Sequence, residues 1–328
     1  TAASLNVTVV DPDRSGFVTA YPCDGAVPTV SSVNFVAGQT VANAVVAPVS
    51  AQGTVCFYSS VPAHLVVDMN GWFATGSAFN SVNPQRLVDT RPEYGQGLTV
   101  VSKQRYGGEA LLTMPIAGVG GVPATGASAV ALNITVTEPV SGGFVTAYPC
   151  GGRPGVSSLN FLAGQTVANA VLAPLSADGR VCLYSNVPTH LVVDINGWFA
   201  TGPGFTAVAP ARLVDTRPSY GQGAITVGKQ QYGGGAVLQL PLLGAAGLPG
   251  SGVGAVALNI TATEPVGNGF VTAYPCGSAV PGVSSVNFVA GQTVANAAVV
   301  PVSGSGQVCL YSNVLTHLVV DIDGWLPA

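Results

Sequence analysis

The sequence predicts an all-β protein made of tandem antiparallel β-sandwich modules of jelly-roll-like type. Three observations carry this prediction. One segment occurs three times with a period of about 126 residues, apolar and polar residues alternate along short stretches, and 43 glycines and 24 prolines interrupt the apolar runs. Alternation with a period of two is typical of half-buried strands, and no stretch combines the 3.6-residue period with the caps of a helix. We therefore expect short strands joined by turns.

The repeated segment, here called segment A, covers about residues 1–76, 127–202 and 253–328, and a different segment B fills residues 77–126 and 203–252. Segment A predicts six strands and segment B two or three, which together suffice for a two-sheet sandwich. The expected strands are 131–137, 144–150, 157–162, 165–175, 180–185 and 189–199 in one A segment, and 211–217, 224–231 and 236–243 in one B segment.

Six cysteines fall as three pairs at equivalent places of the repeat, 33, 32 and 33 residues apart. These separations differ from the short CxxC clusters that bind zinc. We expect three disulfides, each worth on the order of 3 to 4 kcal/mol through restriction of the unfolded chain. Disulfides indicate an oxidising compartment, so the protein is predicted to be extracellular or at the cell surface. The expected pairs are Cys23 with Cys56, Cys150 with Cys182, and Cys276 with Cys309.

Composition limits the partners. Only 7% of the residues are charged, the net charge is -4, and the basic residues form no run, so no nucleic-acid partner is expected. Glycine and proline break each apolar run before it could cross a membrane as a helix, so no membrane insertion is expected.

The start at Thr1, without methionine, is consistent with a processed product or a fragment. The B segments hold seven of the ten Lys and Arg residues and the A segments ten of the fourteen acids, which favours packing of A against B.

Four motifs resemble a known module. They are Arg-Leu-Val-Asp-Thr-Arg at 212–217, Asn-Ile-Thr at 259–261, Gly-Gln-Thr-Val-Ala-Asn at 291–296 and the closing Asp-Ile-Asp-Gly-Trp at 321–325. Together they resemble a tandem β-sandwich module of secreted actinobacterial proteins, which runs from Arg-Leu-Leu-Asp-Thr-Arg to Asp-x-x-Gly-aromatic and mostly has no assigned function. The resemblance covers the whole chain, and the cysteine pairs depart from the family pattern.

The resemblance implies the module order B then A. Residues 79–202 and 205–328 are then complete β-sandwich modules, and residues 1–76 are a partial module that lacks its B segment. Such a module would expose an unpaired sheet edge. Either the boundary of the chain is the result of proteolysis or cloning, or strands of another chain complete the module and give end-to-end polymers.

Two polar motifs near the end of each A segment have structural and functional interpretations. Each histidine precedes an aspartate by four residues, which on a strand is about 13 Å, too far for a catalytic dyad, so structural histidines are favoured. The Asp-x-[Asn/Asp]-Gly motif indicates a turn or bulge, with calcium binding as the weaker alternative. The histidines are His64, His190 and His317, and the weak metal candidates are Asp68, Asn70, Asp194, Asn196, Asp321 and Asp323.

Further candidates point to a ligand or to the fold itself. An acid and a base two residues apart on one strand face predict an internal ion pair, with recognition of a sugar as the alternative. A tryptophan at the end of each A segment could stack on a sugar ring or belong to the core. The Asn-x-Thr sequons at Asn6, Asn133 and Asn259 match N-glycosylation sites on an outward face. The candidate binding residues are Asp89, Arg91, Asp215, Arg217, Trp72, Trp198 and Trp325.

No set of nucleophile, base and metal ligands is evident, so neither an enzyme nor a cofactor is expected. The first functional prediction is an extracellular structural repeat protein that acts as a spacer, cell-surface fibre or adhesin. The alternative is a carbohydrate-binding appendage that anchors to cell-wall or environmental polysaccharide. The corresponding partners are further copies of the chain or a cell-surface glycan.

Overall fold

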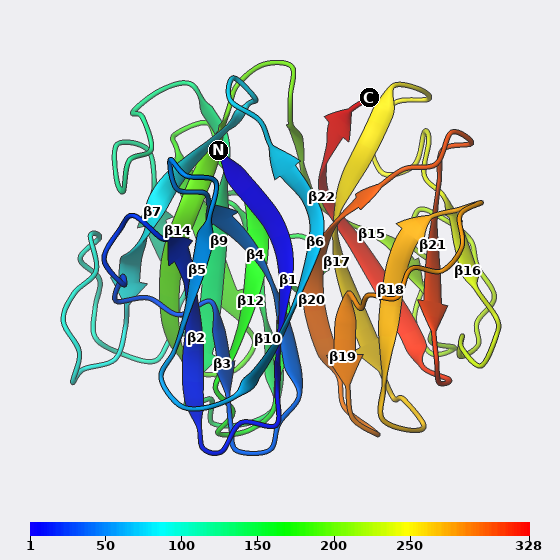
Figure 1. The fold of residues 1–328 in the computed structure, drawn as a ribbon, viewed down its shortest axis with the longest axis horizontal. Coiled ribbons are helices and arrows are strands. Elements are labelled where there is room, and N and C mark those ends of the chain that lie inside the picture. Colours follow the sequence, from blue (N-terminus) through cyan, green and yellow to red (C-terminus); the bar gives the residue numbers. More distant parts are fainter.

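The computed structural model describes residues 1–328 as strands β1 to β22 with no helix, which confirms the all-β prediction. No helix that could cross a membrane is present. Six antiparallel sheets, two from each repeat, surround a common axis in a propeller-like arrangement (Figure 1). The sequence predicted sandwich modules that follow one another in tandem. In the structure the three repeats instead close around one axis. Strands β4, β12 and β20 contact one another there, where mostly Ala and Val side chains, with Leu172 of β12, meet.

The second and third repeats each contain two four-stranded sheets. In the second repeat their orders are β12-β9-β14-β7 and β11-β10-β13-β8, and in the third β20-β17-β22-β15 and β19-β18-β21-β16. The strands are β7 (Phe79–Asp89), β8 (Leu112–Pro115), β9 (Ala127–Thr137), β10 (Gly143–Pro149), β11 (Leu159–Phe161), β12 (Val167–Pro174), β13 (Arg180–Ser185), β14 (His190–Ala200), β15 (Thr206–Asp215), β16 (Leu238–Pro241), β17 (Val253–Thr263), β18 (Gly269–Pro275), β19 (Val286–Phe288), β20 (Val294–Pro301), β21 (Gln307–Ser312) and β22 (His317–Pro327).

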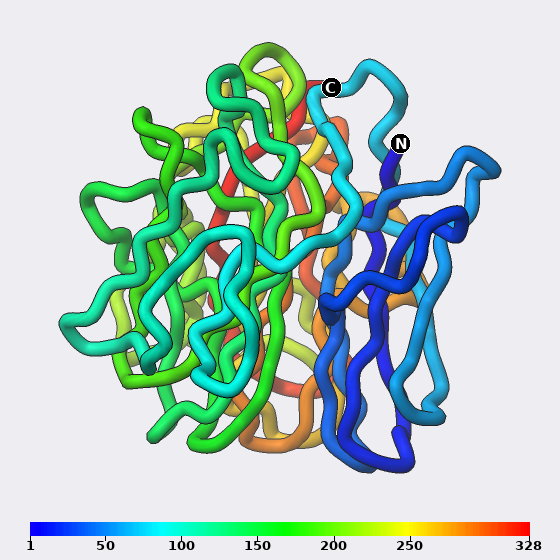
Figure 2. The backbone as a smooth tube through the Cα atoms, turned by 90° about the vertical axis from the view of Figure 1, so that its left-hand side faces the viewer, coloured from blue at the N-terminus to red at the C-terminus, as the bar shows by residue number.

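The first repeat has two three-stranded sheets, β4-β1-β6 and β3-β2-β5. It lies beside the second repeat, and both termini are at the same end of the molecule (Figure 2). No strand occupies the outer positions that β7 and β8 take in the second repeat. Its strands are β1 (Ala2–Val10), β2 (Gly16–Pro22), β3 (Val33–Phe35), β4 (Val41–Pro48), β5 (Val55–Ser59) and β6 (His64–Phe73).

One expected strand is wrong. Residues 224–231 of segment B form bends and irregular structure, and the other expected strands coincide with β9 to β16 to within a few residues, apart from longer ends. The side chain of Gln222 explains the difference, because its amide donates to the carbonyl of Val227 at 3.2 Å and accepts from the Val227 amide at 3.3 Å. The amides of Ala224 and Ile225 donate to β15, whereas a side chain satisfies the backbone groups of Val227 that a neighbouring strand would otherwise bind.

The two sheets of a repeat enclose an apolar core. The second and third repeats each contain a core of 23 buried residues, whereas the first repeat contains 11. Segment B accounts for much of this difference, because β7, β8 and the loops around them contribute apolar side chains that the first repeat lacks. In the second repeat these are Leu87, Val88, Tyr106, Leu112, Met114, Ile116 and Val122.

Six buried asparagines, two from each repeat, join the repeats into a closed ring. The Nδ2 of Asn43 donates to the Oδ1 of Asn133 at 2.8 Å, and the same bond joins the second repeat to the third and the third to the first. The Oδ1 of Asn43 in turn accepts from the amide of Ala170 at 2.9 Å. Buried amides with all partners present bind strongly and directionally. We call this set, Asn6, Asn43, Asn133, Asn169, Asn259 and Asn296, the asparagine ring.

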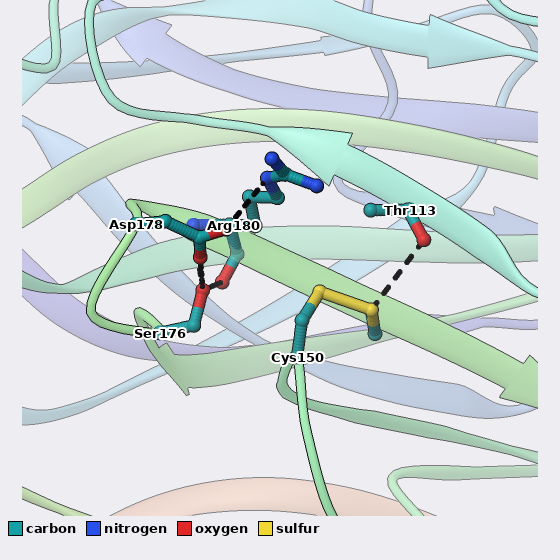
Figure 3. The surroundings of a disulfide bond; sticks show 6 residues. Thr113, Cys150, Ser176, Asp178 and Arg180 are labelled. Atoms are coloured by element: carbon teal, nitrogen blue, oxygen red, sulfur yellow. Dashed lines mark hydrogen bonds and ion pairs between the residues drawn. A yellow bond between two sulfur atoms is a disulfide. The ribbon is translucent and has the colours of Figure 1, made fainter.

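Each repeat carries the disulfide expected from the sequence: Cys23–Cys56, Cys150–Cys182 and Cys276–Cys309, with Cα atoms 5.0 Å apart. Figure 3 shows the bond of the second repeat, where the hydroxyl of Thr113 on β8 lies 3.6 Å from the sulfur of Cys182 on β13. The disulfide therefore lies where segment B joins the outer sheet. Three disulfides and no free cysteine indicate an oxidising environment.

Candidate functional site between the repeats

The end of β7 carries a cluster of charged side chains. Arg86 lies opposite Asp194 of β14 and binds its carboxylate, and it also binds Asp89 at 2.9 Å. Arg91 donates to both oxygens of Asp89, at 3.0 and 2.6 Å, and the ammonium of Lys103 donates to the Asp89 carbonyl at 2.6 Å. The predicted pair of Asp89 and Arg91 is thus one part of a larger network that attaches segment B to segment A.

Burial and charge act in opposite directions on the two carboxyl groups. Burial acts to raise the pKa of Asp89, but hydrogen bonds from Arg91 and the charges of Arg91 and Arg86 outweigh it and hold the pKa below its ordinary value. For Asp194, which is more deeply buried, desolvation prevails over Arg86 and raises the pKa to about 6. At neutral pH the network therefore holds two carboxylates against two guanidinium groups and one ammonium group.

A pocket of about 660 Å³ opens beside this network, between the first and second repeats. The second repeat supplies Arg86, Arg91 and Tyr94, and the guanidinium of Arg91 lies 3.5 Å from the centre of the Tyr94 ring. The first repeat supplies the rings of Phe17 and Tyr58, whose centroids are 6.1 Å apart. Aromatic faces beside guanidinium groups and threonine hydroxyls suit a polar ligand with a ring and a negative charge.

The same network recurs in the third repeat. Arg217 binds Asp215 at 3.0 and 2.6 Å, and Lys229 donates to the Asp215 carbonyl at 2.6 Å. The adjoining pocket, between the second and third repeats, is smaller, at about 340 Å³. Arg153 lines this smaller pocket, and its guanidinium lies 3.8 Å from the centre of the Tyr184 ring. The guanidinium therefore covers a face of Tyr184, whereas the ring of the equivalent Tyr58 lines the larger pocket.

The three tryptophans have two different environments. Trp198 and Trp325 are partly buried and pack against the cores of their repeats. Trp72 is 73% exposed, because the first repeat has no segment B to cover it. The ends of the A segments therefore do not present three equivalent platforms for a sugar ring, and none of the three tryptophans lines either of the two pockets.

The histidines of the complete repeats bind segment B. The Nδ1 of His190 lies 3.3 Å from the hydroxyl of Thr90, which also accepts the amide of Leu191 at 2.8 Å. His317 and Thr216 repeat this arrangement in the third repeat. Both threonines are fully buried, so a substrate cannot reach them as nucleophiles.

The Asp-x-[Asn/Asp]-Gly motif forms a β-bulge within the long last strand. In the second repeat the register shifts between Ile195 and Gly197, both against β9 and against β7. Asp194 is bound by Arg86 and Asp321 by Arg212, so these candidate metal ligands are engaged in ion pairs. No group of three His, Cys, Asp or Glu side chains is placed to hold a metal ion.

Contrary to the expectation from their outward-facing positions, the sequon asparagines are not exposed to solvent. Asn6, Asn133 and Asn259 are at most 3% exposed and belong to the asparagine ring. They face away from the core of their own repeat, as the alternation predicts, but the neighbouring repeat covers that face. An oligosaccharide on these side chains is incompatible with the closed ring.

Sequence reasoning missed the aromatic residues of the pocket. Phe17 and Tyr58 lie beside Arg91 only because two repeats meet there, and nothing within one repeat indicates that contact. A signal was present in the repetition, since Phe144 with Tyr184 and Phe270 with Tyr311 form the same ring pair at 6.1 and 6.2 Å.

Comparisons with known proteins assign no family. The chain matches no protein-family model and no curated protein sequence. Two solved structures are similar over almost its whole length. One is described under the triple jelly roll fold and turret assembly in an archaeal virus (12% identity, TM-score 0.21, 99% of this chain and 80% of that chain), and the other under the atomic structure of Sulfolobus turreted icosahedral virus (11%, 0.20, 100% and 81%). TM-scores this low carry no argument about fold or function.

Proposed function

We propose that the chain is a non-enzymatic extracellular structural repeat protein, a unit of a cell-surface spacer, fibre or adhesin. The observation that carries the proposal is that the buried polar groups bind one another and so connect parts of the fold. The asparagine ring joins repeat to repeat, and the networks of Arg86 and Arg212 join segment B to segment A. These groups are thereby engaged in holding the fold together, as in a protein selected for mechanical and chemical durability.

The assembly proposed here proceeds through the incomplete first repeat. Its strand β6 has a free backbone edge, which is a ready template for another strand. Growth into homopolymers would need the B segment of one copy to enter the first repeat of the next. In this chain β7 and β15 are each paired within their own repeats, so such an exchange between identical copies first requires one complete repeat to open.

The test combines localisation with disulfide state. Native material is fractionated into culture medium, cell surface and cytosol, and its cysteines are mapped by mass spectrometry without reduction. We expect the chain outside the cytosol, with all three disulfides formed, and its assemblies in electron micrographs of the cell surface. Reduced cysteines in a cytosolic fraction would contradict the proposal.

A carbohydrate-binding function is the second candidate, and the pocket beside Arg86 and Arg91 favours it. Aromatic rings on one wall and guanidinium groups on the other suit a saccharide that bears a carboxylate or sulfate group. The occupant would then be an acidic polysaccharide of a cell wall or of the surroundings.

Binding of acidic and neutral polysaccharides to the Tyr58→Ala variant tests this candidate. Tyr58 is 41% exposed in the pocket, so its loss should weaken binding of the acidic polysaccharide at least tenfold while the fold persists. Tyr311→Ala is the matched control, because Tyr311 holds the equivalent position at the interface where no segment B supplies arginines. Equal effects of the two substitutions, or no binding to the unaltered chain, would exclude the pocket as a saccharide site.

A further inference from the structure

The first repeat has two free sheet edges. Strand β6 pairs with β1 on one side only, whereas β14 lies between β9 and β7, and β22 lies between β17 and β15. Strand β5 likewise pairs only with β2, whereas β13 also pairs with β8, and β21 with β16. The open positions in the first repeat are therefore those that segment B fills in the other two.

The backbone of β6 already has the shape that receives a B strand. Its ladder with β1 contains a bulge between Ser4 and Leu5, at the position where β14 and β22 bulge against their inner neighbours. The bulge in β14 contains Gly197, where a Cβ atom would overlap the ring of Phe79 on the entering strand. At the equivalent Gly71 nothing lies within 4 Å. The space that an entering strand needs is thus present and empty.

The polar side chains of β6 also lack their usual partners. Asp68 is the equivalent of Asp194 and Asp321, each of which is bound by an arginine of segment B, but no Lys or Arg pairs with Asp68. His64 is exposed, whereas His190 and His317 are buried against threonines of segment B.

The apolar side chains of β6 show the same difference. Met69 is 67% exposed, whereas the equivalent Ile195 and Ile322 are fully buried. Leu65, Val66 and Val67 are exposed as well, and so is Trp72. The exposed edge of β6 is thus a contiguous apolar strip with free backbone groups. In the second and third repeats, β7 and β15 cover the equivalent strip.

We infer that the first repeat binds a third B segment, one that lies outside residues 1–328, as a strand antiparallel to β6 that carries the motif Arg-Leu-Val-Asp-Thr-Arg. The register follows from β15 on β22, where Arg212 lies opposite Asp321 and Val214 opposite Val320. On β6 the arginine would lie opposite Asp68 and the valine opposite Val67. An intact second copy is not the donor, because both of its B segments are already paired. This inference rests on the proposed function and names the partner of its assembly edge.

The remainder of a B segment would cover β5. In the third repeat β16 pairs with β21 from Leu238 to Pro241, and the segment adds Leu238, Leu240, Leu242 and Leu248 to the core. A full B segment should therefore bind more tightly than the single strand, since it closes both edges and fills the smaller core of the first repeat.

Two labelled probes test the inference on the full chain. One is a peptide with the sequence of residues 205–218, and the other is a polypeptide with the sequence of residues 203–252. We expect the peptide to bind with a dissociation constant on the order of micromolar, and the longer probe at least tenfold more tightly. Binding should shift the emission of Trp72 to shorter wavelength, because the incoming strand excludes water from its ring.

Variants on both sides define the contact. Gly71→Leu should abolish binding without affecting the fold, because its side chain fills the space of the incoming strand, and Gly304→Leu in an open turn is the matched control. Asp68→Ala in the chain and Arg212→Ala in the peptide should each weaken binding about tenfold, and the two together should cost little more than one alone.

Several outcomes would overturn the inference. These are no binding of either probe at millimolar concentration, binding that Gly71→Leu leaves unchanged, and a β6-to-β6 dimer that excludes the peptide. None of them bears on whether the chain is an extracellular structural protein. Conversely, a cytosolic and reduced chain that still binds the peptide would remove the proposed function and leave this inference standing.

Discussion

Strand β6 of the first repeat and strand β14 of the second have nearly the same sequence but opposite environments. They read His-Leu-Val-Val-Asp-Met-Asn-Gly-Trp-Phe and His-Leu-Val-Val-Asp-Ile-Asn-Gly-Trp-Phe, and both pair with their inner neighbour through the same bulge. Residues 64–69 of β6 are mostly exposed, whereas residues 190–195 of β14 are buried. The difference teaches that segment A determines strand, register and bulge by itself, and that segment B determines only what becomes buried.

The largest contrast is expected from removing one apolar side chain at the same position of the two strands. Ile195→Ala should lower the free energy of unfolding by about 3 kcal/mol, because it leaves a cavity in a closed core. Met69→Ala should change it by no more than about 0.5 kcal/mol, because the side chain already contacts water. Native-state hydrogen exchange of the two strands measures both. Equal costs would mean that something covers β6, and a bound B segment should raise the cost of Met69→Ala.

A second contrast concerns the aspartate of each strand. Asp194→Ala should cost about 2 to 3 kcal/mol at pH 7, somewhat less than a fully buried pair, since Arg86 is partly exposed and keeps Asp89 as a partner. Asp68→Ala should cost less than about 0.5 kcal/mol. Chemical denaturation measures the free energy of unfolding of both variants. Asp321→Ala, at the equivalent position of the third repeat, repeats the Asp194→Ala measurement. A large loss from Asp68→Ala would show that Asp68 has a partner in solution.

The smallest effect separates the second and third repeats. Asp323 lies where the second repeat has Asn196, and burial, with the nearby charge of Asp321, raises its pKa to about 8. Between pH 6 and 7 the folded chain keeps this proton and the unfolded chain has lost it, so unfolding releases a proton and stability falls as the pH rises. The expected loss is about 1.4 kcal/mol over that unit.

Asp323→Asn should remove this slope and leave the rest of the pH profile unchanged. The window above pH 6 is chosen because Asp194 and Asp321, whose pKa values burial raises to about 6, contribute mainly below it. Thermal unfolding at pH 6, 7 and 8 measures the slope in both forms. An unchanged slope in Asp323→Asn would assign it to other groups.

Much of each repeat could be predicted from the sequence because its signals are local. Alternation gives the strands of segment A, and the recurrence of the cysteine pairs at equivalent places of the repeat, 32 or 33 residues apart, gives the disulfides. Residues 224–231 alternate as well, yet only Ala224 and Ile225 donate to β15, and at Val227 the side chain of Gln222 takes the place of a neighbouring strand. Alternation reports which face is apolar, and it does not report whether a backbone edge finds a partner.

The contacts between repeats could not be predicted, for a related reason. Asn133 was correctly placed on the face away from the core of its repeat, but alternation does not distinguish a face open to water from one covered by another repeat. The pocket needed the same missing information, since Tyr58 and Arg91 are separated by the boundary between two repeats. Only the three-dimensional arrangement of the repeats brings these side chains together.

The asparagine ring has a consequence for how such a protein can lengthen. Each repeat donates to the next, and the third donates back to the first through Asn296 and Asn6, so the cycle is complete with three members. A fourth repeat outside the closed cycle would find the amide groups of all three repeats already bonded. Lengthening by one repeat therefore requires one of the three contacts to open, whereas a further set of three repeats can close a ring of its own.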